Sequence, residues 1–369
     1  MYIMRSKFEI SSYKMVAICY NSNRTIFQSC CGGVTYESTF ALGRCRCAQI
    51  AFRSFIPAVK QSQFGEVAAI ASRDREKART AAETHGIAKH YGSYAELLAD
   101  PDIDAVYIPL PNHLHREWTI RAARAGKHVL CEKPMSLSER HAVQMVEACE
   151  QFGVKLQESF VYRYHPRYDR VREIVASGEL GDIRAMHGTY TFNKSAVAQD
   201  VRFSREMGGG GLYDVGCYLI SAARYVLGQE PVAATVQALF SPQYDDVDMM
   251  ASGLLEFPNS VGFTFQCGMW AEFTNRLEIR GTDGLIVLPS AFTLRDPLNP
   301  NLLVTVRGET REEPMERLNQ FALEVDRFAR TILFGEPEPF DPWDSVRNMK
   351  ALEACLTSAR EGKRIVIEQ

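Results

Sequence analysis

The chain has 369 residues, and at about 100–200 residues per domain this length predicts two domains. Apolar residues make up 46% of the sequence and charged residues 24%, as in an ordinary folded protein, and the net charge of −3 argues against a nucleic-acid or anionic-membrane partner. No run of about 18 apolar residues occurs, and segment 1–16 lacks the features of a signal peptide, so we expect a cytoplasmic protein that does not span a membrane.

The first part of the chain is difficult to interpret. Residues 1–33 show no sustained period of 2 or 3.6, and we predict a poorly ordered or atypical extension there. Cysteines are concentrated before residue 48, but the Cys30-Cys31 and Cys45-x-Cys47 pairs lack the spacing of a zinc site and have no histidine nearby. The later cysteines are scattered singly, as reduced core residues are. We therefore predict no metal site.

From residue 34 to residue 156, predicted strands and helices alternate. A short apolar run, Thr39–Leu42, comes first. The strands that follow are expected at Glu66–Ser72, Ala105–Ile108, His128–Cys131 and Val154–Gln157, and the helices at Ile50–Lys60, Arg75–His85, Tyr94–Leu98, His113–Ala125 and Ser136–Phe152, the last capped by Ser136. This β-α-β-α order predicts an α/β domain with a parallel, doubly wound sheet.

Residues 157–340 show a different pattern, in which strands follow one another directly. The expected helices lie at about 167–177, 211–227 and 318–334, with a further helix at 343–361 beyond this range. The expected strands lie at Ile183–Phe192, Val232–Phe240, Ala251–Phe257, Val261–Gln266, Arg276–Arg280 and Leu302–Val306. Consecutive strands predict a largely antiparallel sheet, so we expect a second domain of the α+β class. Residues 341–369 are expected to form a helix and a strand that pack back on the rest.

The first strand–helix junction of a dinucleotide-binding domain carries G-x-G-x-x-G/A, where the backbone approaches the pyrophosphate. The best register here is Arg46-Cys-Ala48-Gln-Ile-Ala51, with an arginine in place of the first glycine. We assign Ala48, Gln49 and Ile50 to the cofactor site on this register. Taken alone, the segment also fits an ordinary helix start with small residues.

The end of the second predicted strand indicates which dinucleotide is bound. An acidic residue at this place binds the ribose 2′-hydroxyl of NAD, whereas a basic residue accommodates the 2′-phosphate of NADP. Ser72 and Arg73 supply a hydroxyl and a guanidinium there, and Lys77 follows in the next helix. We predict NADP, while Asp74 leaves NAD open.

Two further strand ends carry polar residues at the edge where open α/β sheets bind ligands. Pro109 to His115 follows the third strand, and we assign Pro109, Asn112 and His115 to the cofactor site; His113 is a weaker candidate. Glu132-Lys133-Pro134 follows the next strand, and we assign Glu132 and Lys133 to the cofactor site as well. A lysine held in a cleft there polarises a substrate oxygen and lowers the pKa of a neighbouring acid. A solvated turn lysine is the alternative.

The segment Gly208–Gly211 precedes a predicted helix on which Asp214 and Tyr218 are four residues apart and share one face. A phenol is a suitable proton donor to a carbonyl oxygen, provided that a cation such as Lys133 lowers its pKa. The alternative is a glycine-rich hinge with Tyr218 packed in the core.

The E-K-P sequence at 132–134, followed by G-G-G-x-L-x-D-x-G-x-Y at 208–218, resembles the glucose–fructose oxidoreductase (Gfo/Idh/MocA) family. The similarity runs over about residues 47–369 and includes the stretches 92–107 and 344–362. Stretches 71–74 and 162–166 resemble the branch that contains NADP-dependent D-xylose dehydrogenases and trans-1,2-dihydrodiol dehydrogenases. The resemblance implies a Rossmann domain, a second domain with an open-faced mixed sheet, and a site between them.

The resemblance also implies roles for single residues. Lys133 orients the substrate hydroxyl, Tyr218 is the general acid/base and Asp214 positions the substrate. Tyr162, Arg163 and Arg202 are implied substrate contacts, with Trp118 as a further wall residue. The implied reaction is hydride transfer between C4 of the nicotinamide and a CH–OH or carbonyl carbon of a sugar, polyol or cyclic diol.

Three expectations remain open at this point. Exposed sheet faces need cover, so we expect a homodimer or homotetramer through the C-terminal sheet. Family members begin their first strand close to the start of the chain and end it in glycine, and we hypothesise that residues 1–46 are not native to the family. Arg46 would then project into the pyrophosphate site. The alternatives to an active enzyme are therefore a nucleotide-binding sensor without turnover and a chain disabled in its first strand.

Overall fold

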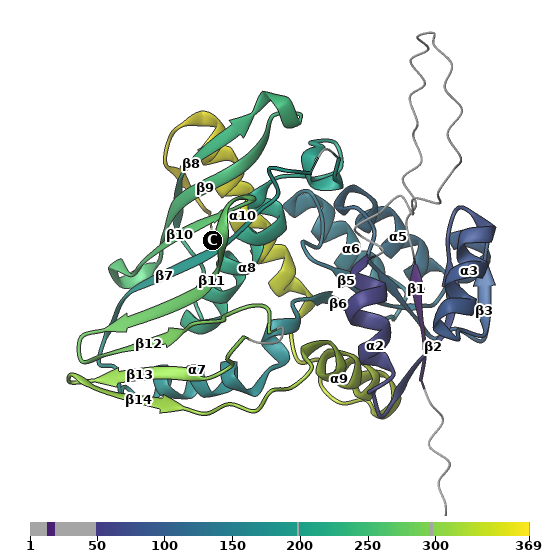
Figure 1. Cartoon of the computed structure of the whole chain (residues 1–369), viewed down its shortest axis with the longest axis horizontal. Helices are drawn as coiled ribbons and strands as arrows, with labels where there is room; N and C mark the ends of the chain where they lie inside the picture. Colours follow the sequence, from purple (N-terminus) through teal and green to yellow (C-terminus); the bar gives the residue numbers. More distant parts are fainter. Residues whose placement is uncertain (1–12, 19–48, 198, 295–297, 369) are drawn as a thin grey trace, which may run out of the picture.

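The computed structural model describes residues 13–18, 49–197, 199–294 and 298–368. Two sheets organise this part of the chain and lie side by side, one of six strands and one of nine (Figure 1). The six strands run in the order β3-β2-β1-β4-β5-β6 with every neighbouring pair parallel, which is the doubly wound order of a dinucleotide-binding domain. Within these ranges, no helix combines the length and the apolar character needed to cross a membrane.

Strands and helices alternate through the first part of the chain, as predicted. They are β1 Tyr13–Ile18, η1 Ala51–Phe55, α2 Ile56–Val59, β2 Gly65–Ala71, α3 Arg75–His85, β3 Lys89–Tyr91, α4 Tyr94–Leu98, β4 Ala105–Ile108, α5 Asn112–Arg124, β5 His128–Glu132, α6 Glu139–Gln151 and β6 Leu156–Ser159. The bounds of α3, α4 and β4 are those predicted. The predicted cap of α6 is wrong, because Ser136 donates to Ser138 O and it is Ser138 that accepts the hydrogen bond from His141 N.

The central strand of this sheet comes from a part of the chain that the sequence analysis placed outside the domain. Tyr13–Ile18 pairs in parallel with both β2 and β4. The prediction that residues 1–33 form an extension is therefore wrong for residues 13–18. A strand with neighbours on both sides is buried on both faces, so a short apolar run is enough to form it. Such a run lacks the alternation of apolar and polar residues by which strands are recognised in a sequence. The run at 39–42 and Arg46 lie outside the described residues.

The second part is a mixed sheet in the order β14-β13-β12-β11-β7-β10-β9-β8-β15, antiparallel except for β7 beside β10. Its strands are β7 Ile183–Asn193, β8 Ala233–Ser241, β9 Val247–Glu256, β10 Gly262–Gly268, β11 Trp270–Gly281, β12 Gly284–Leu288, β13 Leu302–Val306, β14 Glu309–Glu313 and β15 Ile365–Val366. The predicted antiparallel character is confirmed. Strand β14 was not predicted because it lacks apolar residues and forms only by pairing with β13.

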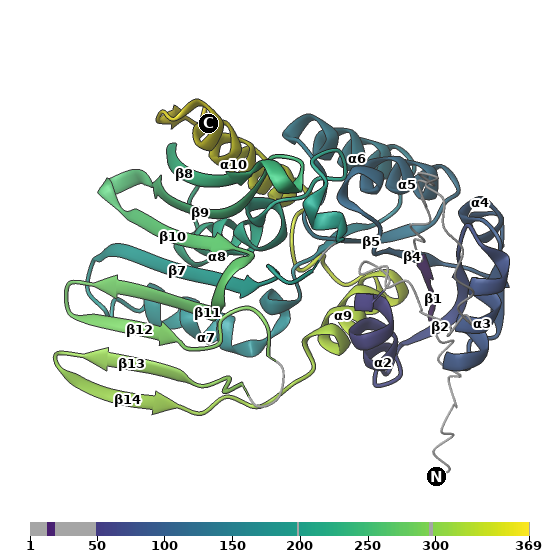
Figure 2. The ribbon, with the colours of Figure 1, turned by 45° about the horizontal axis from the view of Figure 1, so that its top comes forward.

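The helices of the second part are η2 Val161–Tyr164, α7 Pro166–Ala176, η3 Val201–Phe203, η4 Leu212–Gly216, α8 Cys217–Leu227, α9 Gln320–Phe334 and α10 Pro342–Glu361. Helices α7 and α8 lie behind the strands of the sheet, whereas α9 packs beside α2 of the first part (Figure 2). Sequence analysis assigned 157–340 to the second domain, but α9 packs on the first, where Val325 and Phe328 join a buried cluster with Ile56 and Val59. Helix α9 therefore belongs structurally to the dinucleotide-binding domain.

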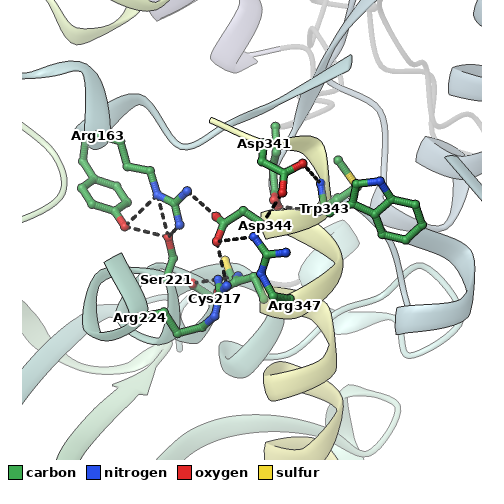
Figure 3. Close-up of polar contacts among 12 residues, drawn as sticks. Arg163, Cys217, Ser221, Arg224, Asp341, Trp343, Asp344 and Arg347 are labelled. Atoms are coloured by element: carbon green, nitrogen blue, oxygen red, sulfur yellow. Dashed lines mark hydrogen bonds and ion pairs between the residues drawn. The ribbon is translucent and has the colours of Figure 1, made fainter. Parts of the chain in front are cut away.

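Helix α10 connects the two parts, because it contacts α6 on one side and α8 and β8 on the other. Asp344, in its first turn, accepts hydrogen bonds from Arg163 Nη1 at 2.6 Å and Arg224 Nη2 at 2.7 Å (Figure 3). The two arginine side chains are only 4% and 1% exposed. One carboxylate therefore holds η2, α8 and α10 together through two cations that are almost removed from water.

We expect Asp344→Ala to destabilise the fold strongly, because it leaves two buried guanidinium groups without that partner. Breaking such a pair typically costs about 3–5 kcal/mol, although Arg224 keeps a second partner in Glu230. The measurement is the free energy of unfolding in urea. Asp182→Ala is the control, since Asp182 pairs with Arg184 on the surface and should change stability by at most about 1 kcal/mol. Equal effects of the two substitutions would contradict this account of α10.

Candidate functional site

A cavity of about 990 Å³ lies at the carboxyl ends of β4 and β5 and extends to the second sheet. This volume is at the upper end of the roughly 300–1,000 Å³ usual for small-molecule sites. Its walls include segments from both parts of the chain, namely Ile50, Arg53 and Ser54, Pro109 to Asn112, Glu132 and Lys133, Tyr190 to Lys194 in part, Arg202, Asp214 and Tyr218, and Arg317 to Phe321. A large cavity at this sheet edge can hold a dinucleotide together with a second ligand.

A row of ion pairs runs along the wall of the cavity, and Lys133, Asp214, Arg202 and Lys194 in it line the cavity itself. Lys133 Nζ lies 3.2 Å from Asp214 Oδ1, and Arg202 Nε lies 2.5 Å from Asp214 Oδ2. Arg202 also pairs with Asp200 at 3.3 Å, and Lys194 completes the row at 2.6 Å from Asp200. The structure thus brings together Lys133, Arg202 and Asp214, which the sequence analysis placed in one site from distant positions.

The charges in this row stabilise one another. Burial raises the pKa of Asp214, but Arg202 foremost and then Lys133 hold that pKa well below its usual range. Burial lowers the pKa of Lys133, but the combined attraction of Asp214, Cys217 and Glu132 outweighs this, and the pKa stays above its ordinary value. Lys133 is therefore an ammonium at neutral pH. Two of its three N–H groups can donate to the backbone and side-chain oxygens of Asp214, which leaves one for a ligand.

Tyr218 lies in the wall of the same cavity, with the Lys133 ammonium 4.9 Å from the centre of its ring. Its ring also packs against Phe160, Tyr190 and Phe292. This burial raises the pKa of Tyr218 well above its ordinary value. The predicted lowering of that pKa by Lys133 is not seen in this structure, because desolvation of the phenolate outweighs the attraction of one ammonium. Tyr218 is a neutral phenol here.

Several predicted site residues lie outside the cavity wall. His115 is fully buried, and its ring nitrogens face the backbone oxygens of Leu110 and Pro134, so it braces two loops and cannot contact a cofactor with its side chain. Tyr162 and Arg163 lie in the packed core: the Tyr162 hydroxyl bonds to Ser221, and Arg163 bonds to Asp344. Their predicted role as substrate contacts is wrong in this structure.

Trp118 also lies away from the cavity. It packs edge-on against Tyr94, with Arg121 over its ring, and it is not among the residues that line the cavity. Its predicted place in the cleft wall is therefore wrong. The position of Trp118 along α5 did not indicate which face of that helix meets the cleft.

The predicted cofactor residues divide into three groups. Ile50, Pro109, Asn112, Glu132 and Lys133 line the cavity. Ser72, Arg73 and Lys77 lie at or after the carboxyl end of β2, with Ser72 buried and the other two exposed, and Gln49 lies beside Ile50 without lining the cavity. Ala48 lies outside the described residues, as do Arg46 and the rest of the junction before Gln49, so the predicted pyrophosphate contact is not tested.

Sequence reasoning missed the contribution of three segments. Arg53 and Ser54 face the cavity from η1, and Lys194 does so from the end of β7. Arg317 to Phe321 joins them at the start of α9, where Gln320 leaves its Nε2 donor without a hydrogen-bond partner. A bound ligand can satisfy such a buried donor, which fits a dinucleotide site here. These positions carry no motif, and only the fold brings them to the cavity.

The described cysteines are Cys131, Cys149, Cys217, Cys267 and Cys355, and all five are free and buried, as predicted. In the described ranges, no group of three or more His, Cys, Asp or Glu side chains is placed to hold a metal ion.

Both parts of the chain match known family models. Residues 47–160 match the oxidoreductase family with an NAD-binding Rossmann fold, and residues 168–287 match the GFO/IDH/MocA C-terminal domain. The first match begins after β1, so Tyr13–Ile18 lies outside it. Two separate models in the expected order cover most of the chain.

Individual relatives agree with these matches. The D-xylose 1-dehydrogenase (NADP(+)) 2 of Haloferax volcanii is 37% identical over 87% of this chain and 98% of its own length. The trans-1,2-dihydrobenzene-1,2-diol dehydrogenase of Xenopus laevis is 33% identical over 64% of this chain and 70% of its own length. The crystal structure of a 3-ketoreductase from Actinomadura kijaniata, in complex with NADP and TDP-benzene, superposes with a TM-score of 0.80 at 30% identity, over 94% of this chain and 98% of that one.

These findings confirm the predicted fold class, the oxidoreductase class and the binding of a nicotinamide dinucleotide in the first domain. They also confirm the resemblance on which the site residues were assigned, although they do not test those residues one by one. By both family models and by its relatives, the chain belongs to the Gfo/Idh/MocA family of oxidoreductases.

Proposed function

We propose that the chain is an NADP-dependent dehydrogenase or reductase that acts on a secondary alcohol, ketone or hemiacetal carbon of a sugar, polyol or cyclic diol. The observation that carries the proposal is the meeting of Lys133, Asp214 and Tyr218 in one cavity at the carboxyl end of the parallel sheet. An ammonium and a phenol side by side are the groups needed to move a proton on and off a substrate oxygen.

The nicotinamide, when bound, supplies or accepts the hydride. The chain's own residues handle the proton and the orientation of the substrate. Lys133 uses its remaining N–H to hold the substrate oxygen, and its charge stabilises negative charge that develops there. Tyr218, as a neutral phenol, donates its proton to that oxygen during reduction and takes it back during oxidation. Asp214 fixes Lys133 and Arg202 in position from the other side.

The preference for NADP rests on the residues after β2. Ser72 and Arg73 stand at the place where the ribose is bound, and Arg73 is exposed there. Asp74, which left NAD open, is already used as the cap of α3: its carboxylate accepts hydrogen bonds from the backbone N–H of Glu76 and Lys77. Both bonds use Oδ1, so the cap engages one oxygen of this carboxylate, which favours Arg73 over Asp74 as the residue that meets the ribose. NADP is named for both the xylose dehydrogenase and the 3-ketoreductase relatives.

The class of substrate follows from the relatives and from the cavity wall. The relatives are named for xylose, a dihydrodiol and a 3-keto sugar nucleotide, which are all cyclic or can cyclise and carry adjacent oxygens. Tyr190 and Tyr218 give the cavity flat aromatic surfaces, and Lys133 and Arg202 give it donors. A hydroxylated ring has the apolar face and the polar edge that suit such a wall.

Association of two or four copies through the C-terminal sheet is part of the same proposal.

Fluorescence titration tests the cofactor. We expect NADPH to bind more tightly than NADH, and Arg73→Ala to weaken NADPH binding by roughly 10-fold or more through loss of a charge-assisted contact, with NADH little affected. Arg79→Ala is the control, because Arg79 lies on α3, the helix that follows Arg73, and pairs with Glu76 and Glu83. Absence of binding by either nucleotide would mean that residues before Gln49 disable the site. Equal weakening of both nucleotides would contradict the assignment of Arg73.

Turnover with aldoses and cyclic diols tests the chemistry. Tyr218→Phe and Lys133→Met should each lower kcat by about 10²–10⁴-fold, the usual contribution of a positioned acid/base, while Tyr218→Phe leaves the Kd for NADPH unchanged. Tyr244→Phe serves as the control, since Tyr244 packs against Phe203 and Trp270 away from the cavity. If the unaltered chain binds NADPH tightly but turns over no such substrate, the alternative of a nucleotide-binding sensor without turnover is favoured.

A further inference from the structure

The four glycines that precede the helix of Asp214 and Tyr218 are crowded by other parts of the chain. A Cβ on Gly209 would overlap the backbone oxygen of Arg202, and one on Gly210 would overlap Oδ1 of Asp248. Gly210 also has φ +114°, where side chains are rarely accommodated. The glycines are thus required because a backbone segment and a carboxylate pack directly against them.

Asp248 is the carboxylate in question. It lies on β9, is 2% exposed, and accepts a hydrogen bond at Oδ2 from the backbone N–H of Leu212 at 2.6 Å. Leu212 is the first residue of η4, which continues into α8, so its N–H has no acceptor within the helix itself. Asp248, which lies on strand β9, therefore caps the helix that carries Asp214 and Tyr218.

The backbone around Gly210 connects the cap at Leu212 to the ion pairs of the cavity. Gly210 N donates to Arg202 O at 3.0 Å, and Gly210 O accepts from Asp214 N at 3.0 Å. Arg202 and Asp214 then meet through their side chains. One peptide segment thus contacts Asp248 on one face and fixes the backbone of both Arg202 and Asp214 on the other.

We propose that Asp248 is a positioning residue for the reaction: its carboxylate fixes the first turn of the helix and, through Gly210, the arrangement of Arg202, Asp214 and Lys133. This inference rests on the proposed function, because positioning is measured as turnover. Asp248 touches neither the cavity nor, by its position, a substrate.

The environment of Asp248 adds a dependence on pH. Tyr213, Cys267 and Arg360 are the titratable or charged side chains that interact with it, from η4, β10 and α10. Burial raises the pKa of Asp248 from its ordinary 3.8 to about 7, against the opposing effect of the backbone N–H groups. As pH falls through about 7 the carboxylate is protonated and its capping bond weakens, so kcat should fall.

Stability should change in the opposite direction over the same range. Because the folded-state pKa is raised, the protonated group contributes stability that is present at low pH and is lost as pH rises through about 7. From about pH 7 down toward 4, this group therefore favours folding while it disfavours turnover. Loss of activity caused by simple unfolding would not show this pattern.

The test is Asp248→Asn, which keeps the shape of the side chain but resembles the protonated acid. We expect kcat at pH 8 to fall by roughly 10-fold, as for loss of a helix cap transmitted to a site, with Kd for NADPH unchanged and Tm not lowered. The inflection of kcat near pH 7 should also disappear. Asp246→Asn is the matched control: it lies two residues away, is exposed, pairs with the same Arg360, and should leave kcat unchanged.

An unchanged kcat in Asp248→Asn, or a fall of kcat, Tm and NADPH affinity together, would overturn the proposal. If the variant does not fold, hydrogen exchange in the unaltered chain decides the matter. Opening of 208–218 would uncover Asp248 and return its pKa to the ordinary value, so the amides of 208–218, corrected for intrinsic exchange, should gain protection between pH 8 and pH 6 while those of α5 do not. Equal behaviour of the two segments would overturn the proposal. This readout needs no substrate, so it separates failure of the inference from failure of the proposed function.

Discussion

The ion pairs of Asp214 are the interaction on which the site depends. This buried carboxylate lies between a lysine that follows a strand of the first domain and an arginine in η3 of the second. Removing it would leave two cations facing each other across the cavity, and neither would keep its present position. The cost of burying Asp214 is offset because both partners are themselves largely buried and oriented, which is the condition under which such pairs hold. The two domains are thereby tied together at the place where the chemistry is proposed.

A second set of buried ion pairs also holds separate elements of the chain together, farther from the cavity. Arg163 and Arg224 share Asp344, and so hold the end of the parallel sheet against α8 and α10 (Figure 3). Helix α8 therefore has its N-terminal end fixed by Asp248 and its middle fixed by this network. Because the helix is constrained at these two places, Tyr218 projects into the cavity from a rigid support, which is what a proton donor requires to keep its distance from a substrate oxygen.

The sequence predicted well those elements whose signal is local. Helix α3 has an aspartate cap and a glycine after its end, and its predicted bounds are those observed. Lys133, Asp214 and Arg202 were placed in one site because strand ends of a parallel sheet converge and because the two motifs resemble a family.

The errors concern properties that depend on distant contacts. His115 follows a strand as Lys133 does, yet its ring turns inward to two backbone oxygens, and no spacing distinguishes these cases. Strand β14 exists only through its pairing with β13, and Asp248 acquires its role only because β9 passes beneath the glycines.

The protonation state of Tyr218 has a consequence for the direction of the chemistry. Packing among aromatic rings keeps this phenol neutral, so in the proposed reaction it is ready to give a proton, as reduction of a carbonyl requires. Oxidation of an alcohol requires the phenolate instead, and within the described part of the chain Lys133 is the cation that lies over the ring and can stabilise it. The Lys133 ammonium is held in place by Asp214, whose own negative charge opposes that stabilisation. The balance between the two directions thus depends on how far Asp214 is neutralised by Arg202, which makes the arginine as important to the tyrosine as the lysine beside it.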